Sequence, residues 1–475
     1  MAAQLGSLTR VLGVRLRALS AGLGDSVARA SYLRKWLLLG AAIGVIAGFG
    51  AVAFYELLKA STWFFLHLLV GYDAPAAHGE ASIRPSSWFG RPWAIPLIVG
   101  LGGLLSGLLV YRFAPEAEGH GTDAAIHAVH EDPRGIRGRT VVVKLFASAL
   151  TIGSGGSGGR EGPTAQISAG FSSFLARLLN LDRADGRIAV SVGIGAGIGA
   201  IFKAPLGGAV LAAEILYRDD IEVETLLPAI IASIISYAIF GAFEGFAPLF
   251  GYLARFQLHN PLELAWFALI GVVCGLVGLL YAKGFYGLSD LFDRLPVTRY
   301  VRPALGGLVV GVMALWIPQV LGTGYGWVQV SLGRQSLLHL SLAVVLLLPF
   351  AKILATGFSI GSGGSGGVFG PGLVIGAFVG ASLWRLLEPF APGLPHAPGA
   401  FVVVAMMACF GSISRAPLGV MLMVAEMTGS IEILAPAMIA VGLATLIVRH
   451  FDATIYRSQR HSRTENPAGA SSALP

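Results

Sequence analysis

Residues Gly153–Gly159 read Gly-Ser-Gly-Gly-Ser-Gly-Gly, and residues Gly361–Gly367 repeat the same seven letters 208 positions later. Each copy follows an isoleucine and has a lysine, Lys144 or Lys352, nine positions before its first glycine. Farther along, Ala-Pro-Leu-Gly occurs at 204–207 and again at 416–419, and in both copies a glutamate follows the proline by nine positions. Because two elements recur in the same order at nearly one offset, the sequence predicts two related halves, 36–250 and 257–457.

The composition predicts that both halves lie in a lipid bilayer. The 475 residues are 55% apolar and 12% charged, with a mean hydropathy of +0.73, whereas soluble globular proteins carry about 25% charged residues. This leaves too little polar surface to cover a 49.4 kDa protein in water. A soluble enzyme, a disordered scaffold and a secreted disulfide domain are therefore disfavoured, and we expect an all-α, polytopic membrane protein.

The basic residues predict the orientation of the chain. Residues 1–35 hold six basic residues and one acid, and the tail from Arg449 is also rich in arginine. Cytoplasmic flanks of membrane helices carry an excess of Lys and Arg. We expect a cytoplasmic segment at 1–35, a cytoplasmic tail at 458–475 and an even number of crossings. The net charge of +7 gathers at the ends of apolar runs and forms no stripe that would bind nucleic acid.

Several apolar runs have the wrong length for simple membrane spans. Ile188–Phe202 and Ala204–Ala213 are short, whereas Ile353–Trp384 is long and is interrupted by glycines and Pro371. Broken backbone at membrane depth is tolerated only where protein or a polar cavity covers it. Interrupted segments in corresponding positions of two halves predict half-helices and a transport site near the midplane.

The five residues Gly159–Pro163, Gly-Arg-Glu-Gly-Pro, predict the start of a half-helix. Proline fits the first turn of a helix, and the free N–H groups and positive dipole end attract anions. Glu161 places a carboxylate there, which can occupy the anion's position when ionised and leave when protonated, acting as a gate and a proton carrier. The alternative is that Glu161 caps the helix or pairs with Arg160.

Gly-Val-Phe-Gly-Pro at 367–371 is the matching start in the second half, and it has no carboxylate. If the halves are inverted, the N–H groups of Arg160–Gly162 and of Val368–Gly370 converge and bind one anion through partial charges. Partial charges suit a transporter because a buried Lys or Arg would hold the ion too tightly. The alternative is that these glycines only permit helices to cross closely.

Residues 119–123, Gly-His-Gly-Thr-Asp, resemble a third helix start, in which His120 and Thr122 offer hydrogen-bond donors. A lone histidine in a loop is more often solvated. Cys274 and Cys409 lie in apolar runs and are expected to be packing residues. We expect no metal and no cofactor. An intramembrane hydrolase using a serine of the Gly-Ser repeats is a remote alternative, because no histidine has a comparable buried context.

Together these motifs resemble those of the CLC family of chloride channels and chloride/proton exchangers. Residues 159–163 resemble its gating-glutamate motif, residues 367–371 its Gly-x-Phe-x-Pro motif, and residues 452–456 its terminal segment, whose tyrosine reaches the ion. The resemblance covers about residues 30–457. It implies two inverted repeats per subunit with broken half-helices. It also implies a homodimer with one pathway per subunit. Such a protein moves chloride and protons and is not an enzyme. Short loops and the missing cytoplasmic domains suggest a bacterial inner membrane.

Carried over to this chain, the resemblance assigns roles to eight residues. Glu161 is the external gate, and the Tyr456 hydroxyl donates to the central anion. The anion sites are lined by His120 at the inner helix start and by the N–H groups of Arg160, Glu161, Gly162, Val368, Phe369 and Gly370.

Two departures from the family pattern leave alternatives open. His120 stands where the family usually has serine and Asp123 where it has proline, which leaves the choice of anion open. Exchangers commonly have a second glutamate directly after the one matching Glu214, but here Ile215 follows. Glu214, Lys144 and Lys352 are expected to be structural. A chloride/proton antiporter is the main prediction, and a passive voltage- or pH-gated chloride channel is the alternative.

Overall fold

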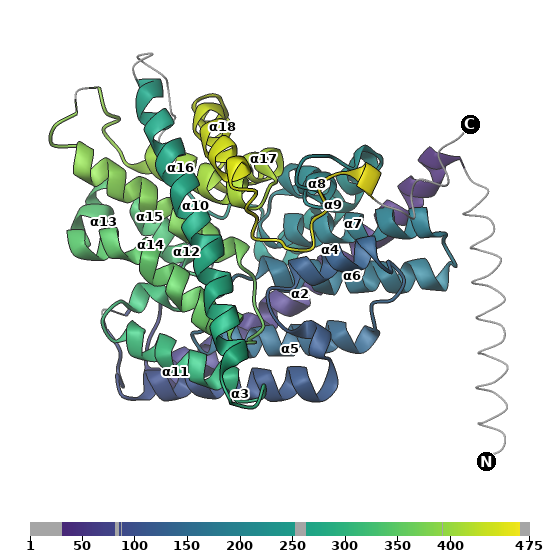
Figure 1. Ribbon diagram of the computed structural model, residues 1–475, viewed down its shortest axis with the longest axis horizontal. Helices are drawn as coiled ribbons and strands as arrows, with labels where there is room; N and C mark the ends of the chain where they lie inside the picture. Colours follow the sequence, from purple (N-terminus) through teal and green to yellow (C-terminus); the bar gives the residue numbers. More distant parts are fainter. Residues whose placement is uncertain (1–30, 81–84, 87, 252–262, 392, 466–475) are drawn as a thin grey trace.

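The computed structural model describes residues 31–80, 85–86, 88–251, 263–391 and 393–465. Within these ranges the chain is helical, with three isolated β-bridges and no named strand. Seven helical segments are long and apolar enough to cross a membrane. The chain is thus an all-α, multi-pass integral membrane protein, as predicted (Figure 1). The predicted boundary at residue 257, residues 1–30 and residues 466–475 lie outside the described ranges.

The first half consists of α2 with the π-helical turn η1 that continues it, followed by helices of very different lengths. In chain order these are α2 (Tyr32–Thr62), η1 (Trp63–Val70), α3 (Ala94–Phe113), η2 (Pro115–Ala117), α4 (Thr122–His130), α5 (Gly138–Gly153), α6 (Glu161–Leu178), α7 (Arg183–Ile201), α8 (Pro205–Glu214) and α9 (Val223–Glu244). The short α8 is the half-length piece that the run at 204–213 predicts. The prediction that the run at 188–202 is too short is wrong, because this run belongs to α7, whose 19 residues are long and apolar enough to cross a membrane.

The second half follows the same order with one added short helix, α13. Its elements are α10 (Glu263–Arg294), α11 (Arg302–Ala314), η3 (Pro318–Val320), α12 (Tyr325–Leu332), α13 (Arg334–His339), α14 (Leu342–Thr356), η4 (Gly357–Gly361), α15 (Phe369–Leu387), α16 (Gly399–Ile413), α17 (Pro417–Thr428) and α18 (Leu434–His450), and η5 (Arg463–Glu465) lies in the tail.

Equivalent helices of the two halves pack against each other in opposite directions. In the pair α8 and α17, Gly207 lies against Met423, and Leu211 lies against Gly419. The pair α3 and α11 behaves alike, because Gly103 contacts Pro303 near one end and Gly311 contacts Pro96 near the other. Small residues let these helix backbones approach closely. The repeats therefore have inverted topology, as the fold prediction states.

Two glutamates cap the partner repeat's helices in a reciprocal manner. The Glu214 carboxylate accepts hydrogen bonds from the N–H groups of Leu418 (3.2 Å) and Gly419 (2.7 Å) at the start of α17. The Glu426 carboxylate accepts from Leu206 (3.1 Å) and Gly207 (2.7 Å) at the start of α8. Carboxylates satisfy the free N–H groups and complement the dipole at a helix start. The structural role predicted for Glu214 is confirmed.

The two repeated lysines hold corresponding turns. Lys144 donates to the carbonyl groups of Ala117 (3.1 Å) and Gly119 (2.7 Å), just before α4. Lys352 donates to Val320 and Gly322, both at 2.9 Å, just before α12. Both side chains are buried, and carbonyl partners offset the cost of burying their charge. This geometry confirms their predicted structural role. Cys274 and Cys409 are buried free thiols, also as expected.

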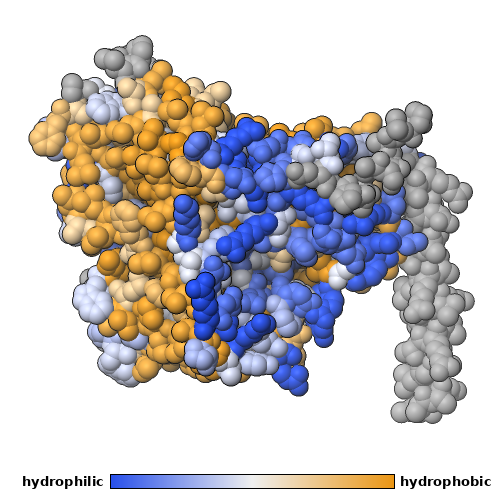
Figure 2. Space-filling view, in the orientation of Figure 1, coloured by the Kyte–Doolittle hydropathy of each residue, from blue (hydrophilic) through white to orange (hydrophobic). Residues whose placement is uncertain are grey.

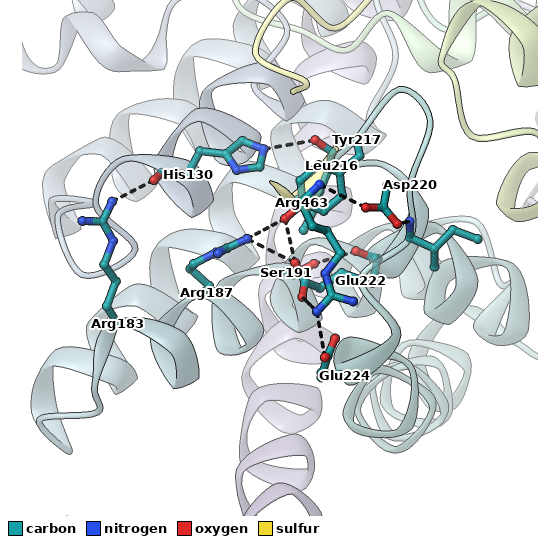
Figure 3. Close-up of polar contacts among 12 residues, drawn as sticks. His130, Arg183, Arg187, Ser191, Leu216, Tyr217, Asp220, Glu222, Glu224 and Arg463 are labelled. Carbon is teal, nitrogen blue, oxygen red and sulfur yellow. Dashed lines mark hydrogen bonds and ion pairs between the residues drawn. The ribbon is translucent and has the colours of Figure 1, made fainter. Parts of the chain in front are cut away.

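The tail crosses from the second half back onto the first. Figure 3 shows Arg463 beside Glu222 and Glu224, to which its guanidinium lies at 3.4 and 2.7 Å. Arg187 of α7 and the Tyr217 hydroxyl both donate to the Glu222 carboxylate, at 3.1 and 2.8 Å. Figure 2 shows hydrophilic residues gathered around this region, whereas apolar residues cover the side on which α10 and α14 lie.

Candidate functional site

The two Gly-Ser repeats meet at the centre of the molecule, where α6 and α15 begin. The N–H group of Gly159 donates to the Gly367 carbonyl at 2.7 Å, and the N–H group of Gly367 donates back to Gly159 at 2.6 Å. One residue after these glycines stand the N-caps of the two helices, Arg160 and Val368. The predicted convergence of two half-helix starts is confirmed, because an inverted repeat brings equivalent segments together about its own axis.

Hydroxyl groups hold the crossing in a symmetric way. Ser157 bonds to Thr356 at 3.0 Å, and its repeat equivalent Ser365 bonds to Ser148 at 2.9 Å. Ser154 and Ser362 donate to carbonyl groups of the preceding helix turn. These four serine hydroxyls have hydroxyl and carbonyl partners rather than a histidine. The contacts favour a structural role for them over the remote hydrolase alternative.

Glu161 is fully buried, and its carboxylate reaches across to the other helix start. One oxygen, Oε1, accepts a hydrogen bond from the N–H group of Phe369 at 2.7 Å. The Tyr325 hydroxyl lies 3.4 Å from Oε2. The negative group thus occupies the N-terminus of α15, where an anion is favoured.

Glycines approach this carboxylate so closely that side chains in their place would displace it. A Cβ atom on Gly159 would overlap both Glu161 oxygens, and a Cβ atom on Gly367 would overlap Oε1. A Cβ atom on Gly370 would meet the Tyr325 hydroxyl. Close backbone approach to a charged group is a common use of glycine. The glycines at matching positions of the two segments therefore make room for the Glu161 carboxylate and also let the two segments cross closely.

Arg160 does not pair with Glu161 in this structure. Its guanidinium forms an ion pair with Glu80 at 2.6 Å and lies 5.0 Å from the ring centroids of both Tyr55 and Tyr325. Such cation–π contacts and a charge-assisted hydrogen bond hold the side chain in place. The alternative in which Arg160 neutralises Glu161 directly is not what the geometry shows.

His120 is 7% exposed and thus not solvated, although loop histidines usually are. Its ring lies 5.6 Å from the Tyr456 ring and 6.1 Å from the Phe285 ring, measured between centroids. The N–H group of Asp123 lies 3.4 Å from Nδ1 and donates to it. Nε2 is therefore the ring nitrogen that carries the proton in the neutral side chain.

Tyr456 is 1% exposed, and its ring lies beside that of His120, just before the start of α4. Its ring is 6.4 Å from Phe410, whose ring is 4.2 Å from Phe369. The N–H group of Ser458, two residues on, donates to the Asp123 carboxylate at 2.8 Å. The carboxylate that replaces the family's proline thus anchors the segment that carries Tyr456.

Sequence reasoning missed three residues of this site, namely Tyr325, Tyr281 and Glu80. The Tyr281 hydroxyl donates to the Val368 carbonyl at 2.7 Å, and this long helix α10 carries no motif that would have pointed to it. Tyr325 did leave a signal in the sequence. Gly-Thr-Gly-Tyr at 322–325 precedes Lys352, just as Gly-His-Gly-Thr at 119–122 precedes Lys144, and the two spacings differ by only a few residues. Glu80 lies 80 positions from Arg160 and left none.

In the described part of the chain, no group of three or more His, Cys, Asp or Glu side chains is placed to hold a metal ion.

Comparison with known proteins agrees with this geometry. Residues 102–449 match the family described as voltage gated chloride channel. The chain is 30% identical over 428 residues to the voltage-gated ClC-type chloride channel ClcB of Escherichia coli, covering 89% of this chain and 97% of that protein. It is 29% identical over 430 residues to the H(+)/Cl(-) exchange transporter ClcA of Cronobacter sakazakii, covering 87% and 86%.

Two solved structures share the fold. A slow cyanobacterial Cl-/H+ antiporter aligns with a TM-score of 0.75 at 23% identity, covering 90% of this chain and 96% of that one. A CLC-type fluoride/proton antiporter aligns with a TM-score of 0.76 at 21% identity, covering 91% and 100%. On the family match and the 30% identity over most of its length, this chain belongs to the voltage gated chloride channel family.

Proposed function

We propose that this protein exchanges chloride for protons across a membrane and that Glu161 is both its gate and its proton carrier. The observation that carries the proposal is the 2.7 Å hydrogen bond from the Phe369 N–H group to the Glu161 carboxylate. A carboxylate at that point stands in for a bound anion, because it uses the same N–H donors and the same dipole.

The proposed cycle follows from the charge of Glu161. When ionised, its side chain fills the anion position between α6 and α15. When protonated, it loses its charge and leaves, and chloride takes the released donors. We assign these donors to the N–H groups of Arg160, Glu161, Gly162, Val368, Phe369 and Gly370. Each donor carries a partial charge only, so the ion is held weakly enough to leave again.

A second anion position is proposed beside Tyr456 and His120. The Tyr456 hydroxyl and the protonated Nε2 of His120 are donors on neighbouring rings, 5.6 Å apart between centroids. Both groups are neutral, which again favours release over tight binding. An imidazole donor in place of the family's serine hydroxyl is the feature of this chain that we expect to influence anion choice.

The names of relatives and structural neighbours support chloride and protons as the transported ions. They include an H(+)/Cl(-) exchange transporter and a Cl-/H+ antiporter. One neighbour is a fluoride/proton antiporter, so the anion has to be measured for this chain.

A passive chloride channel is the second candidate, and Ile215 favours it. This side chain is fully buried at the position after Glu214, where exchangers commonly have a proton-carrying glutamate. An apolar side chain cannot carry a proton, so antiport requires another route from the cytoplasm to Glu161.

The deciding experiment measures chloride and proton flux together in proteoliposomes. For an antiporter, a chloride gradient drives protons uphill, and Glu161→Gln abolishes proton movement while chloride still flows. Glu432→Gln, an exposed loop glutamate, is the matched control and keeps both fluxes. If the wild type moves chloride without moving protons, the protein is a passive channel and the antiport proposal is wrong.

We further infer a homodimer with one pathway per subunit in a bacterial inner membrane, with both ends of the chain in the cytoplasm. Glu224 supports the placement of both ends of the chain on the same side of the membrane, because it contacts residues near each end. Its carbonyl accepts from the Tyr32 hydroxyl at 2.5 Å, and its carboxylate pairs with Arg463 at 2.7 Å. Light scattering in detergent tests the dimer, for which the protein mass is twice 49.4 kDa.

A further inference from the structure

A groove of about 500 Å³ runs between α3 and α5, away from the anion site. Its walls are mostly apolar, and two arginines stand among them. The lining side chains are Leu109, Arg112, Phe113, Arg139, Val142, Val143 and Phe146. We propose that this groove binds one anionic phospholipid, with its phosphate between Arg112 and Arg139 and an acyl chain along the apolar floor.

The groove arises from the way α3 and α5 pack. At one end the helices approach closely, since a Cβ atom on Gly102 would overlap the Ser154 side chain. Toward the other end, Val110 and Val143 belong to a small buried cluster between the helices, and Leu109, Phe113 and Phe146 line the groove beside it. The floor is therefore the α3–α5 contact itself, which gives the groove a fixed shape.

The groove opens toward lipid rather than toward protein. Val142 is 56% exposed and Phe146 is 47% exposed, as is Phe113 at 53%. In a membrane protein, apolar side chains at this exposure contact acyl chains. A preformed apolar groove favours the binding of an acyl chain, because the protein loses little conformational freedom when the lipid binds.

The two arginines stand where a phospholipid phosphate would lie. Arg112 is in the last turn of α3 and Arg139 in the first turn of α5. The loop between α4 and α5 meets the tail, since Arg460 pairs with Glu131 at 2.7 Å. The arginines thus lie at the membrane face that carries the tail. Basic pockets between helices at such a face bind anionic head groups.

Both guanidinium groups are available for a ligand. Among the described residues, neither Arg112 nor Arg139 forms an ion pair with a carboxylate, and Arg112 instead lies 5.7 Å from the centroid of the Phe113 ring. The nearby acid Glu116 is paired with Arg137 and so does not neutralise them. The two unpaired arginines match the charge of a lipid phosphate, and the apolar groove beside them matches the shape of an acyl chain.

Native mass spectrometry of the full chain in detergent tests the proposal. Phosphatidylglycerol is titrated against phosphatidylcholine with the same acyl chains. The wild type should prefer phosphatidylglycerol, and the double variant R112Q/R139Q should bind it roughly thirtyfold more weakly, since each basic residue contributes a factor of about five. Val142→Trp narrows the apolar groove at its exposed wall without changing charge and should weaken both lipids.

The control is R294Q/R299Q, which removes two exposed arginines of the α10–α11 region that do not line the groove. It should leave lipid affinity within about twofold. Equal affinity of the wild type for both lipids, or an equal loss in the control, would overturn the proposal. Displacement of the lipid by glycerol 3-phosphate would indicate a soluble phosphate ligand instead. A change in oligomer mass in R112Q/R139Q without loss of lipid would mean that a second copy covers the groove.

Discussion

Single residues in this protein act through contacts that their neighbours in sequence do not reveal. Asp123 illustrates this, because its N–H group donates to His120 and its carboxylate accepts from Ser458 at 2.8 Å. It therefore links the inner helix start to the segment carrying Tyr456. We consider it a positioning residue, since no contact with the transported ion is implied.

Asp123→Ala should weaken chloride binding several-fold and lower thermal stability. The reason is that the partly buried Ser458 N–H group loses its charged acceptor, and a hydrogen bond to a charged group contributes about 1.5–3 kcal/mol at most where water has partial access. Asp123→Asn keeps an acceptor oxygen and should stay close to the wild type. Chloride titration by calorimetry measures the effect.

A double-mutant cycle separates positioning from a general loss of stability. If Asp123 acts through Tyr456, then D123A should add little to the affinity loss of Tyr456→Phe. Fully additive losses would contradict the positioning role.

At the scale of helices, the reciprocal caps make the two repeats depend on each other. Glu214 on α8 caps α17, and Glu426 on α17 caps α8, with the shorter bond at 2.7 Å in both directions. Each carboxylate serves the helix of the other repeat. Neither short helix has its first turn satisfied without its partner.

Glu214→Gln and Glu426→Gln should each destabilise the protein by about 2 kcal/mol, the typical value for hydrogen bonds to a charged acceptor. An amide keeps one acceptor oxygen but turns an NH₂ group toward the second N–H donor. Thermal unfolding in detergent measures the shift, with Glu432→Gln as the exposed control.

The symmetry of the caps makes the prediction stricter. The two variants should shift the melting temperature by similar amounts, and Glu214→Gln should retain proton coupling in the flux assay. A coupling defect in Glu214→Gln alone would mean that this residue carries protons and is not only a cap.

At the scale of the whole molecule, the tail joins the two halves and positions Tyr456. The buried Gln459 amide donates to the Ile215 and Ser414 carbonyl groups, both at 2.9 Å, and its oxygen accepts from Thr454 at 2.6 Å. Arg463 adds ion pairs on the first half, but its side chain is 37% exposed. The two anchors differ in burial and thus in expected strength.

Gln459→Ala should lower both stability and chloride affinity, because three buried hydrogen bonds are lost next to Tyr456. Arg463→Gln should change stability by no more than about 1 kcal/mol, since exposed ion pairs contribute little. Thermal unfolding and chloride calorimetry on the same preparations compare them. A larger effect of Arg463→Gln would contradict this ranking of the anchors.

Local pattern was sufficient for the fold class and for the two helix starts that meet at the centre of the candidate site. Hydropathy predicts the spans, and proline and glycine mark the starts of α6 and α15, because capping and chain reversal depend on adjacent residues. The two identical glycine segments predict the internal repeat, and Glu161 is recognisable as a carboxylate inside an apolar region. Each of these signals is carried by residues close together in the chain.

Tertiary packing alone decided which partners these residues have. The Arg160–Glu80 pair joins residues 80 positions apart, and the Asp123–Ser458 contact joins residues 335 positions apart. The groove between α3 and α5 likewise depends on how two helices pack. Such contacts follow from the relative placement of whole helices, and no local propensity encodes that placement.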